Sequence, residues 1–179
     1  MADGTLKVGT ITNSAGSGNI AIGSGVTLLS NTPAFFANLS AATSITDGTK
    51  TKIQFDEKVF DTDSVYDNST NYRFTVPSGK AGKYFFNSKA LLTIPEATSL
   101  FNRGEIFFYK NGAEAGKAIT DNRTNYGTQY TINDSVVFDL DVSDYVEVYA
   151  RLYVQGGTPT INGGSGYYHT TFSGYRIGA

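Results

Sequence analysis

The chain has 179 residues, and none of them is a cysteine. Without cysteine, neither a disulfide framework nor a thiolate metal site or nucleophile can form, so stability has to come from packing. The net charge is -2, and no run of Lys and Arg could follow a phosphate backbone, so we do not expect nucleic acid as a partner. No stretch approaches the roughly 20 apolar residues that span a bilayer, so we do not expect membrane insertion either.

Two further absences concern export and catalysis. Residues 1–9 lack the basic start and apolar core of a secretory signal, which predicts that the chain is made and folded in a cytoplasm. The single histidine, His169, lies among tyrosines after a Gly-rich loop, with no serine elbow or cysteine to pair with it. We therefore expect an ordinary loop histidine, no enzyme activity and no resident cofactor.

What the chain does contain is a series of aromatic, glycine-punctuated segments that runs from Pro33 almost to the C-terminus. Their hydrophobic period is two: from Tyr145 to Val154 apolar side chains alternate with Tyr, Glu and Arg, which predicts a strand with one core face. The sequence Lys110-Asn111-Gly112-Ala113 is typical of a tight hairpin. Short strands separated by frequent turns predict one all-β domain, a two-sheet antiparallel sandwich or jelly roll.

One predicted strand carries aromatic side chains on both of its faces. Tyr84 and Phe86 share the more apolar face with Ala90 and Leu92, so we expect these four side chains to point inward. Phe85 then points outward. A single exposed Phe is ordinary, whereas a cluster with aromatic residues of neighbouring strands would mark an interface.

The first 32 residues differ from the rest because they contain no aromatic side chain. Apolar residues alternate there between Gly- and Ser-rich stretches, and they are Leu6, Val8, Ile20, Ile22, Val26 and Leu28. The segment is either a flexible linker or an arm that completes a partner's sheet or wraps a partner's surface. We prefer the arm, because a plain linker would not need alternating apolar residues. The predicted parts are thus an attachment arm, residues 1–32, and a head, residues 33–179.

The ordered segments from Pro33 to Ile177 resemble the globular head domain of complement component-one subunit-q, a relative of the tumour necrosis factor jelly roll. The similarity lies in the opening strand Pro33–Ala37, in Phe74–Pro77 followed by Gly82–Phe86, in the Lys110–Gly112 hairpin and in the closing Phe172–Tyr175. Where the family usually has Gly-Asp, this chain has Ser143-Asp144. That difference leaves the conformation of one turn open.

The resemblance implies a two-sheet jelly roll that forms a homotrimer around a threefold axis. By position in that fold, the outward residues of the inner sheet would lie toward the axis, and these are Phe36, Phe85, Val137 and Phe172. Asp139 and Asp141 share a strand face with Val137, so threefold symmetry would gather their carboxylates. Such a ring either binds a hard cation such as Ca²⁺ or is neutralised by the nearby Arg176.

The arm resembles the opening of tail-fibre and other virion structural proteins of marine bacteriophages. The similar segments are Thr5–Ile11, Ala15–Ile22 and Gly25–Leu28. This resemblance implies that the protein belongs to a virion, assembles inside a host cell and is released by lysis.

Together these features predict a trimeric virion surface protein that decorates or cements the head of the particle, with the capsid as the partner of its arm. The runner-up is a tail-associated receptor-binding tip that recognises a glycan or a receptor on the host surface. A third alternative is a secreted soluble recognition ligand, but the collagen-like repeats and the signal peptide that would support it are absent.

Overall fold

The computed structural model describes residue 24 and residues 32–94, 100–121 and 127–178. Every regular element within these ranges is a β-strand, and they contain no helix long and apolar enough to cross a membrane. The chain divides between residues 31 and 32 into two units, and the second unit begins at Thr32. The fold of this unit is all-β, as the sequence predicts.

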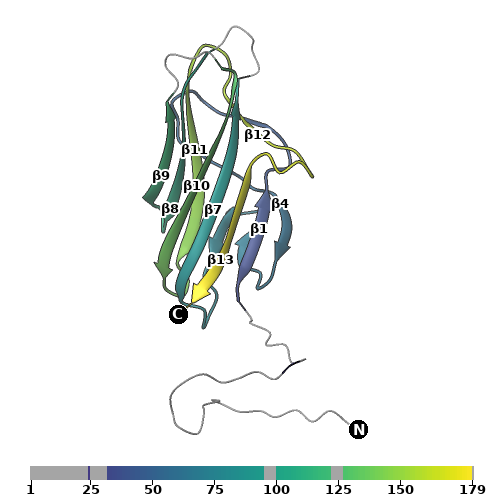
Figure 1. Ribbon diagram of the computed structural model, residues 1–179, viewed down its shortest axis with the longest axis vertical. Coiled ribbons are helices and arrows are strands. Elements are labelled where there is room, and N and C mark those ends of the chain that lie inside the picture. Colours follow the sequence, from purple (N-terminus) through teal and green to yellow (C-terminus); the bar gives the residue numbers. More distant parts are fainter. Residues whose placement is uncertain (1–23, 25–31, 95–99, 122–126, 179) are drawn as a thin grey trace. The chain divides into compact units, whose positions relative to one another are not determined.

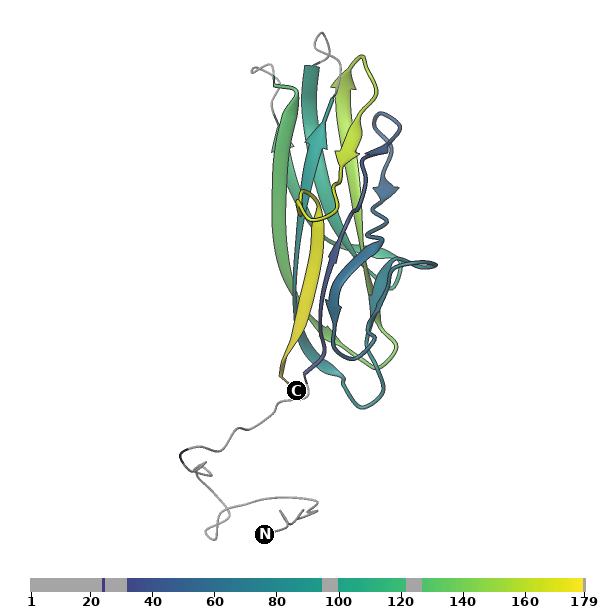
Figure 2. The ribbon, with the colours of Figure 1, turned by 90° about the vertical axis from the view of Figure 1, so that its right-hand side faces the viewer.

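The strands form two antiparallel sheets packed face to face (Figures 1 and 2). In sheet order, the first contains β2 (Thr43–Ser44), β12 (Thr160–Asn162), β7 (Gly82–Thr93), β13 (Thr171–Gly178), β1 (Ala34–Asn38) and β4 (Glu57–Asp61), while β10 (Gln129–Leu140) also pairs with β7. The second contains β5 (Tyr66–Asp67), β6 (Arg73–Thr75), β11 (Tyr145–Gln155), β8 (Leu100–Lys110) and β9 (Ala113–Asp121), while β3 (Thr51–Lys52) also pairs with β11.

The core lies between the two sheets, because every second side chain of each strand points toward the opposite sheet. The inward residues of β7 are Tyr84, Phe86, Ala90 and Leu92, and those of β11 are Val146, Val148, Ala150 and Leu152; all are at most 1% exposed. The inward faces predicted for these two segments are therefore confirmed.

Phe172 lies in this core, so the prediction that it faces outward is wrong. Its side chain is 0% exposed, and its ring centre lies 4.9 Å from that of Phe35. The register of β13 against β7 explains the error. Phe172 pairs with the buried Ser88, whereas Tyr175 pairs with Phe85, and residues one position apart in a strand face opposite sides of a sheet. The outward aromatic residue of β13 is Tyr175.

Two turns depend on residues with positive φ. Asn111 and Gly112 join β8 to β9 with φ values of 51° and 80°, which confirms the predicted tight hairpin. Ser143, between β10 and β11, has a φ of 73°. The serine thus adopts the left-handed conformation for which glycine is best suited, and the turn is kept despite the sequence difference.

The strain at Ser143 can be tested by substitution. Ser143→Gly should raise the free energy of unfolding by about 0.5–1 kcal/mol. A left-handed residue with a Cβ costs about 1–2 kcal/mol, and glycine removes this cost. Part of the gain is offset because the unfolded chain has more conformational entropy with glycine. Urea denaturation followed by tyrosine fluorescence measures the change. Ser135→Gly, inside β10, should instead be destabilising. A loss of stability in Ser143→Gly would contradict the strained turn.

Candidate assembly face

The outward face of the first sheet carries a group of apolar side chains, here called the assembly face. It consists of Phe36, Phe60, Phe85, Val137, Tyr168 and Tyr175, which come from β1, β4, β7, β10, β13 and the loop before β13. Val137 is 57% exposed, Tyr175 50% and Phe60 49%. Large apolar side chains grouped at this exposure are characteristic of a surface that contacts another molecule.

The register between strands aligns these side chains in two adjoining rows. In the first row Val137 pairs with Phe85 and Phe85 pairs with Tyr175, with the last two ring centres 5.4 Å apart. In the second row Phe60 pairs with Phe36, and the ring centre of Phe36 lies 6.3 Å from that of Phe60 and 5.3 Å from that of Tyr168. The result is an aromatic strip across the sheet.

The structure brings Phe36, Phe85 and Val137, three of the predicted interface residues, to this one face. Phe60 and Tyr168 were not found from the sequence, because their ring contacts with Phe36 join segments that are far apart in the chain. Tyr175 was missed because Phe172 was taken as outward: the two residues lie three positions apart, so alternation places them on opposite faces of the strand.

Within one protomer the hydrogen bond of Arg176 goes to the backbone and not to the acidic residues of β10, and its neutralising them between copies stays a prediction. Its Nη2 donates a hydrogen bond to the Ala81 carbonyl at 2.6 Å, and its Nε is buried without a partner. Burial raises the pKa of the nearby Tyr84 hydroxyl, and the charge of Arg176 opposes that shift. Arg176 therefore acts within the protomer, where it holds the start of β7 against β13.

Asp139 and Asp141 do not form a metal site within one chain. Asp139 is exposed in β10 and pairs with Lys83 of β7, while Asp141 follows the strand and donates its backbone N–H to the Asp144 carboxylate. In the part of the chain that the structure describes, no three His, Asp or Glu side chains gather into a metal-binding group. A Ca²⁺ ion would need carboxylates from several copies, and this site stays a prediction.

The outward face of the second sheet has a different chemistry. Glu105 is 0% exposed and accepts hydrogen bonds from Arg103 and Arg151. Phe107 is also fully buried on this face, with the Lys50 ammonium 4.4 Å from its ring centre. These charges are satisfied within the chain and cover the Phe107 ring, and the outward tyrosines of this face, Tyr109, Tyr145, Tyr149 and Tyr153, are half-buried. Among the described residues of this sheet, Ile119 is the large apolar side chain that is exposed on this face.

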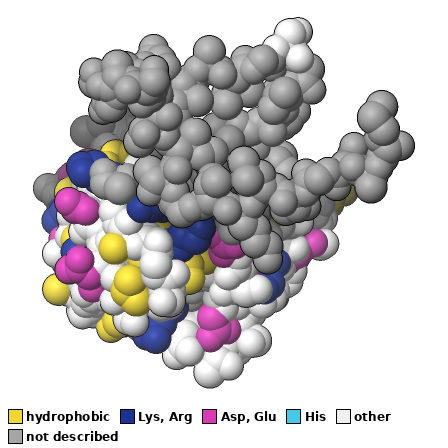
Figure 3. Space-filling view, turned by 90° about the horizontal axis from the view of Figure 1, so that it is seen from below, with side chains coloured by type: hydrophobic (Ala, Val, Ile, Leu, Met, Phe, Trp, Pro, Cys, Tyr) yellow, Lys and Arg dark blue, Asp and Glu magenta, His cyan; other side chains and the backbone are white. Residues whose placement is uncertain are grey.

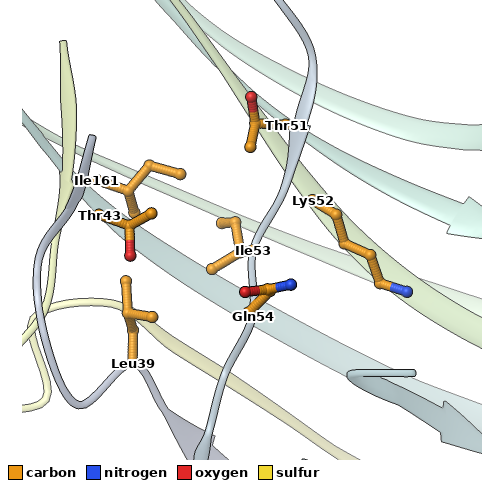
Figure 4. A pocket seen from close by; sticks show the side chains of 7 residues that line it. All are labelled: Leu39, Thr43, Thr51, Lys52, Ile53, Gln54 and Ile161. Carbon is orange, nitrogen blue, oxygen red and sulfur yellow. The ribbon is translucent and has the colours of Figure 1, made fainter. Parts of the chain in front are cut away.

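A pocket of 260 Å³ lies where the segment after β1 faces the segment after β3. In Figure 4, Ile53 points toward Leu39 and Ile161, whereas Lys52 points away from them. Lys52 forms an ion pair with Glu147 at 2.6 Å. The other lining residues are Thr43, Thr51 and Gln54, so the lining supplies no nucleophile paired with a base.

The end of the head at which β7 begins and β13 ends has a mixed surface. Seen from below, hydrophobic side chains there alternate with Lys, Arg, Asp and Glu, without one dominant charge (Figure 3). The six apolar arm residues predicted to attach the protein to a particle, Leu6, Val8, Ile20, Ile22, Val26 and Leu28, lie outside the described residues.

The chain matches no protein-family model and no curated protein sequence. Among solved structures it is similar to the globular domain of the zebrafish complement 1qA protein, with 16% identity, coverage of 82% of this chain and 98% of that chain, and a TM-score of 0.55. It is also similar to murine APRIL, with 14% identity, coverage of 80% of this chain and 97% of that chain, and a TM-score of 0.56. These similarities confirm the expected fold, a jelly roll like those of complement 1q and tumour necrosis factor.

Proposed function

We propose that the chain is a subunit of a homotrimer whose copies pack through the assembly face. The observation that supports this most is the contrast between the two outward sheet faces: Phe60, Val137 and Tyr175 are about half exposed on the first, whereas on the second charged groups cover Phe107 and the tyrosines are half-buried. Contact with further copies would remove apolar area from water, and this burial stabilises the assembly by about 25 cal/mol per Å² of apolar surface. The resemblance to the complement head implies a threefold axis on this side of the jelly roll, which supports a trimer rather than a dimer.

We further propose that this trimer is a structural module of a bacteriophage virion and not an enzyme. In this role the arm, residues 1–32, binds the capsid, and the head decorates or cements the particle surface. Support comes from the resemblance of the arm to virion structural proteins. Added backbone pairing and small apolar anchors are the contacts that such an arm would supply.

The role of the arm can be tested by deletion. A chain without residues 1–32 should still fold and trimerise, because the core that the structure describes is built from Phe35 and later residues. It should no longer bind particles that lack the protein, since its contacts to the capsid are gone. Co-sedimentation of the full and shortened chains with such particles measures attachment. Equal co-sedimentation of both chains would contradict the attachment role.

A receptor-binding tip is the second candidate function, and one specific feature favours it. Tyr167 is 76% exposed, and it is not needed to close the core. Adsorption separates the two candidates: particles that lack a decoration protein should still adsorb to host cells, whereas particles that lack a receptor-binding tip should not.

A further inference from the structure

The loop between β12 and β13 is held firmly against β1 and β4. Asn38 in β1 donates through Nδ2 to the Gly164 carbonyl at 3.0 Å, and the Gly164 N–H donates to the Leu39 carbonyl at 2.9 Å. Ser165 donates through Oγ to a Glu57 carboxylate oxygen of β4 at 2.8 Å. Three hydrogen bonds, to Asn38 in β1, to Leu39 directly after it and to Glu57 in β4, thus position a short Gly-rich segment.

This positioning has two local costs. Tyr168 has a φ of 51°, a conformation that a bulky side chain disfavours. The Oδ1 atom of Asn38, which contacts the same loop, is buried without a hydrogen-bond partner although both donors of its amide are used. Strained backbone and unpaired buried polar atoms persist where the surrounding structure enforces them, and they concentrate at functional sites.

The strained conformation separates two neighbouring tyrosines. The Tyr168 ring packs on Phe36, with ring centres 5.3 Å apart, while Tyr167 points into solvent. At 76%, Tyr167 is the most exposed of the large apolar side chains that the structure describes. Its ring is parallel to that of His169, with 4° between the ring planes and 5.6 Å between the ring centres. The loop therefore presents a supported, open aromatic ring.

We propose that Tyr167, supported by His169, is a stacking site for a pyranose ring of a neutral saccharide. A pyranose has an apolar C–H face that packs on an aromatic ring and a polar edge of hydroxyl groups. Ser165 lies in the loop and donates to Glu57 of β4, whose carboxylate keeps acceptor positions beyond its bonds to Asn38 and Ser165. This inference deepens the second candidate function and rests on it.

A saccharide fits this site better than a protein partner does. An anchor residue in a protein interface is surrounded by contacts that exclude water, whereas Tyr167 is 76% exposed and the residues before it in the loop are Gly164, Ser165 and Gly166. These small residues leave the ring open on its sides and provide backbone polar groups at its edge. One exposed aromatic ring with polar groups around it matches a ligand with one apolar face and a polar rim.

The test uses the full chain and an array of immobilised neutral oligosaccharides, followed by saturation-transfer NMR with methyl β-D-glucopyranoside and methyl β-D-galactopyranoside. The wild-type chain should bind a subset of the oligosaccharides. Tyr167→Ala should weaken that binding at least tenfold, because the stacking ring is lost, whereas Tyr167→Phe should retain it. The control Ile119→Ala removes a side chain that is 46% exposed on the second sheet and should bind like the wild type.

Two results would overturn the proposal: a wild-type chain that binds none of the saccharides, or a Tyr167→Ala chain that binds them as the wild type does.

Light scattering of the same proteins separates this proposal from the trimer. If Tyr167→Ala becomes monomeric, Tyr167 is a contact between copies and the saccharide site is wrong. If the wild-type chain is monomeric but binds saccharides in a Tyr167-dependent way, the trimer is wrong and the saccharide site holds.

Discussion

Phe85→Asp should convert the trimer into a monomer that is still folded. Phe85 lies in the middle of the first row of the assembly face, between Val137 and Tyr175. A carboxylate at this position would be buried without a partner when copies associate, which costs several kcal/mol. The protomer should tolerate the change, because Phe85 is half-exposed and points away from the core. Size-exclusion chromatography with light scattering at micromolar concentration measures the mass.

Ile119→Asp is the matched control for this substitution. Ile119 is also partly exposed, at 46%, but it lies in β9 of the second sheet, opposite Glu105. The same charge placed there should leave the trimer intact. If both variants dissociate, the loss reflects general destabilisation, and if the wild-type chain is monomeric, the assembly face has a different role.

Phe172→Ala should lower the free energy of unfolding of the protomer by about 3–5 kcal/mol, the usual range for removing a fully buried phenylalanine ring. Phe172 is 0% exposed, and its ring packs against rings from both sheets, including those of Phe35, Phe86 and Phe108. Urea denaturation of Phe172→Ala in the Phe85→Asp background measures the change in the free energy of unfolding without a contribution from assembly.

Tyr175→Ala in the same background is the comparison. Tyr175 lies in the same strand but is 50% exposed on the outward face, so its loss should cost less than about 1 kcal/mol in the monomer. A cost for Phe172→Ala as small as that for Tyr175→Ala would contradict the placement of Phe172 in the core. Loss of trimer mass in Tyr175→Ala without the Phe85→Asp change would support the assembly face.

Much of the fold could be predicted because its signals are local. The alternation in β7 and β11 indicates which side chains point inward, and this follows from backbone geometry within each strand. The Asn-Gly pair indicates the hairpin between β8 and β9, since both residues accept positive φ. The order of the aromatic segments indicates the jelly roll, which the similarity to the complement 1qA domain and to murine APRIL confirms.

The candidate sites depend on contacts that no local pattern contains. Register between distant strands decides which face a side chain occupies, and a one-residue error placed Phe172 outside when it lies in the core. Strand pairing brings Phe36 and Phe60 together, and the loop bonded to Asn38 and Leu39 places Tyr168 on Phe36 and leaves Tyr167 exposed.

The sequence by itself determined the class of fold, the inward faces of β7 and β11 and the tight hairpin, because each follows from the spacing and φ preferences of neighbouring residues. Only the tertiary structure decided the composition of the assembly face and the conformation of the Tyr167 loop. Both depend on strand pairing and on side-chain hydrogen bonds across long separations in the chain, such as that between Asn38 and Gly164.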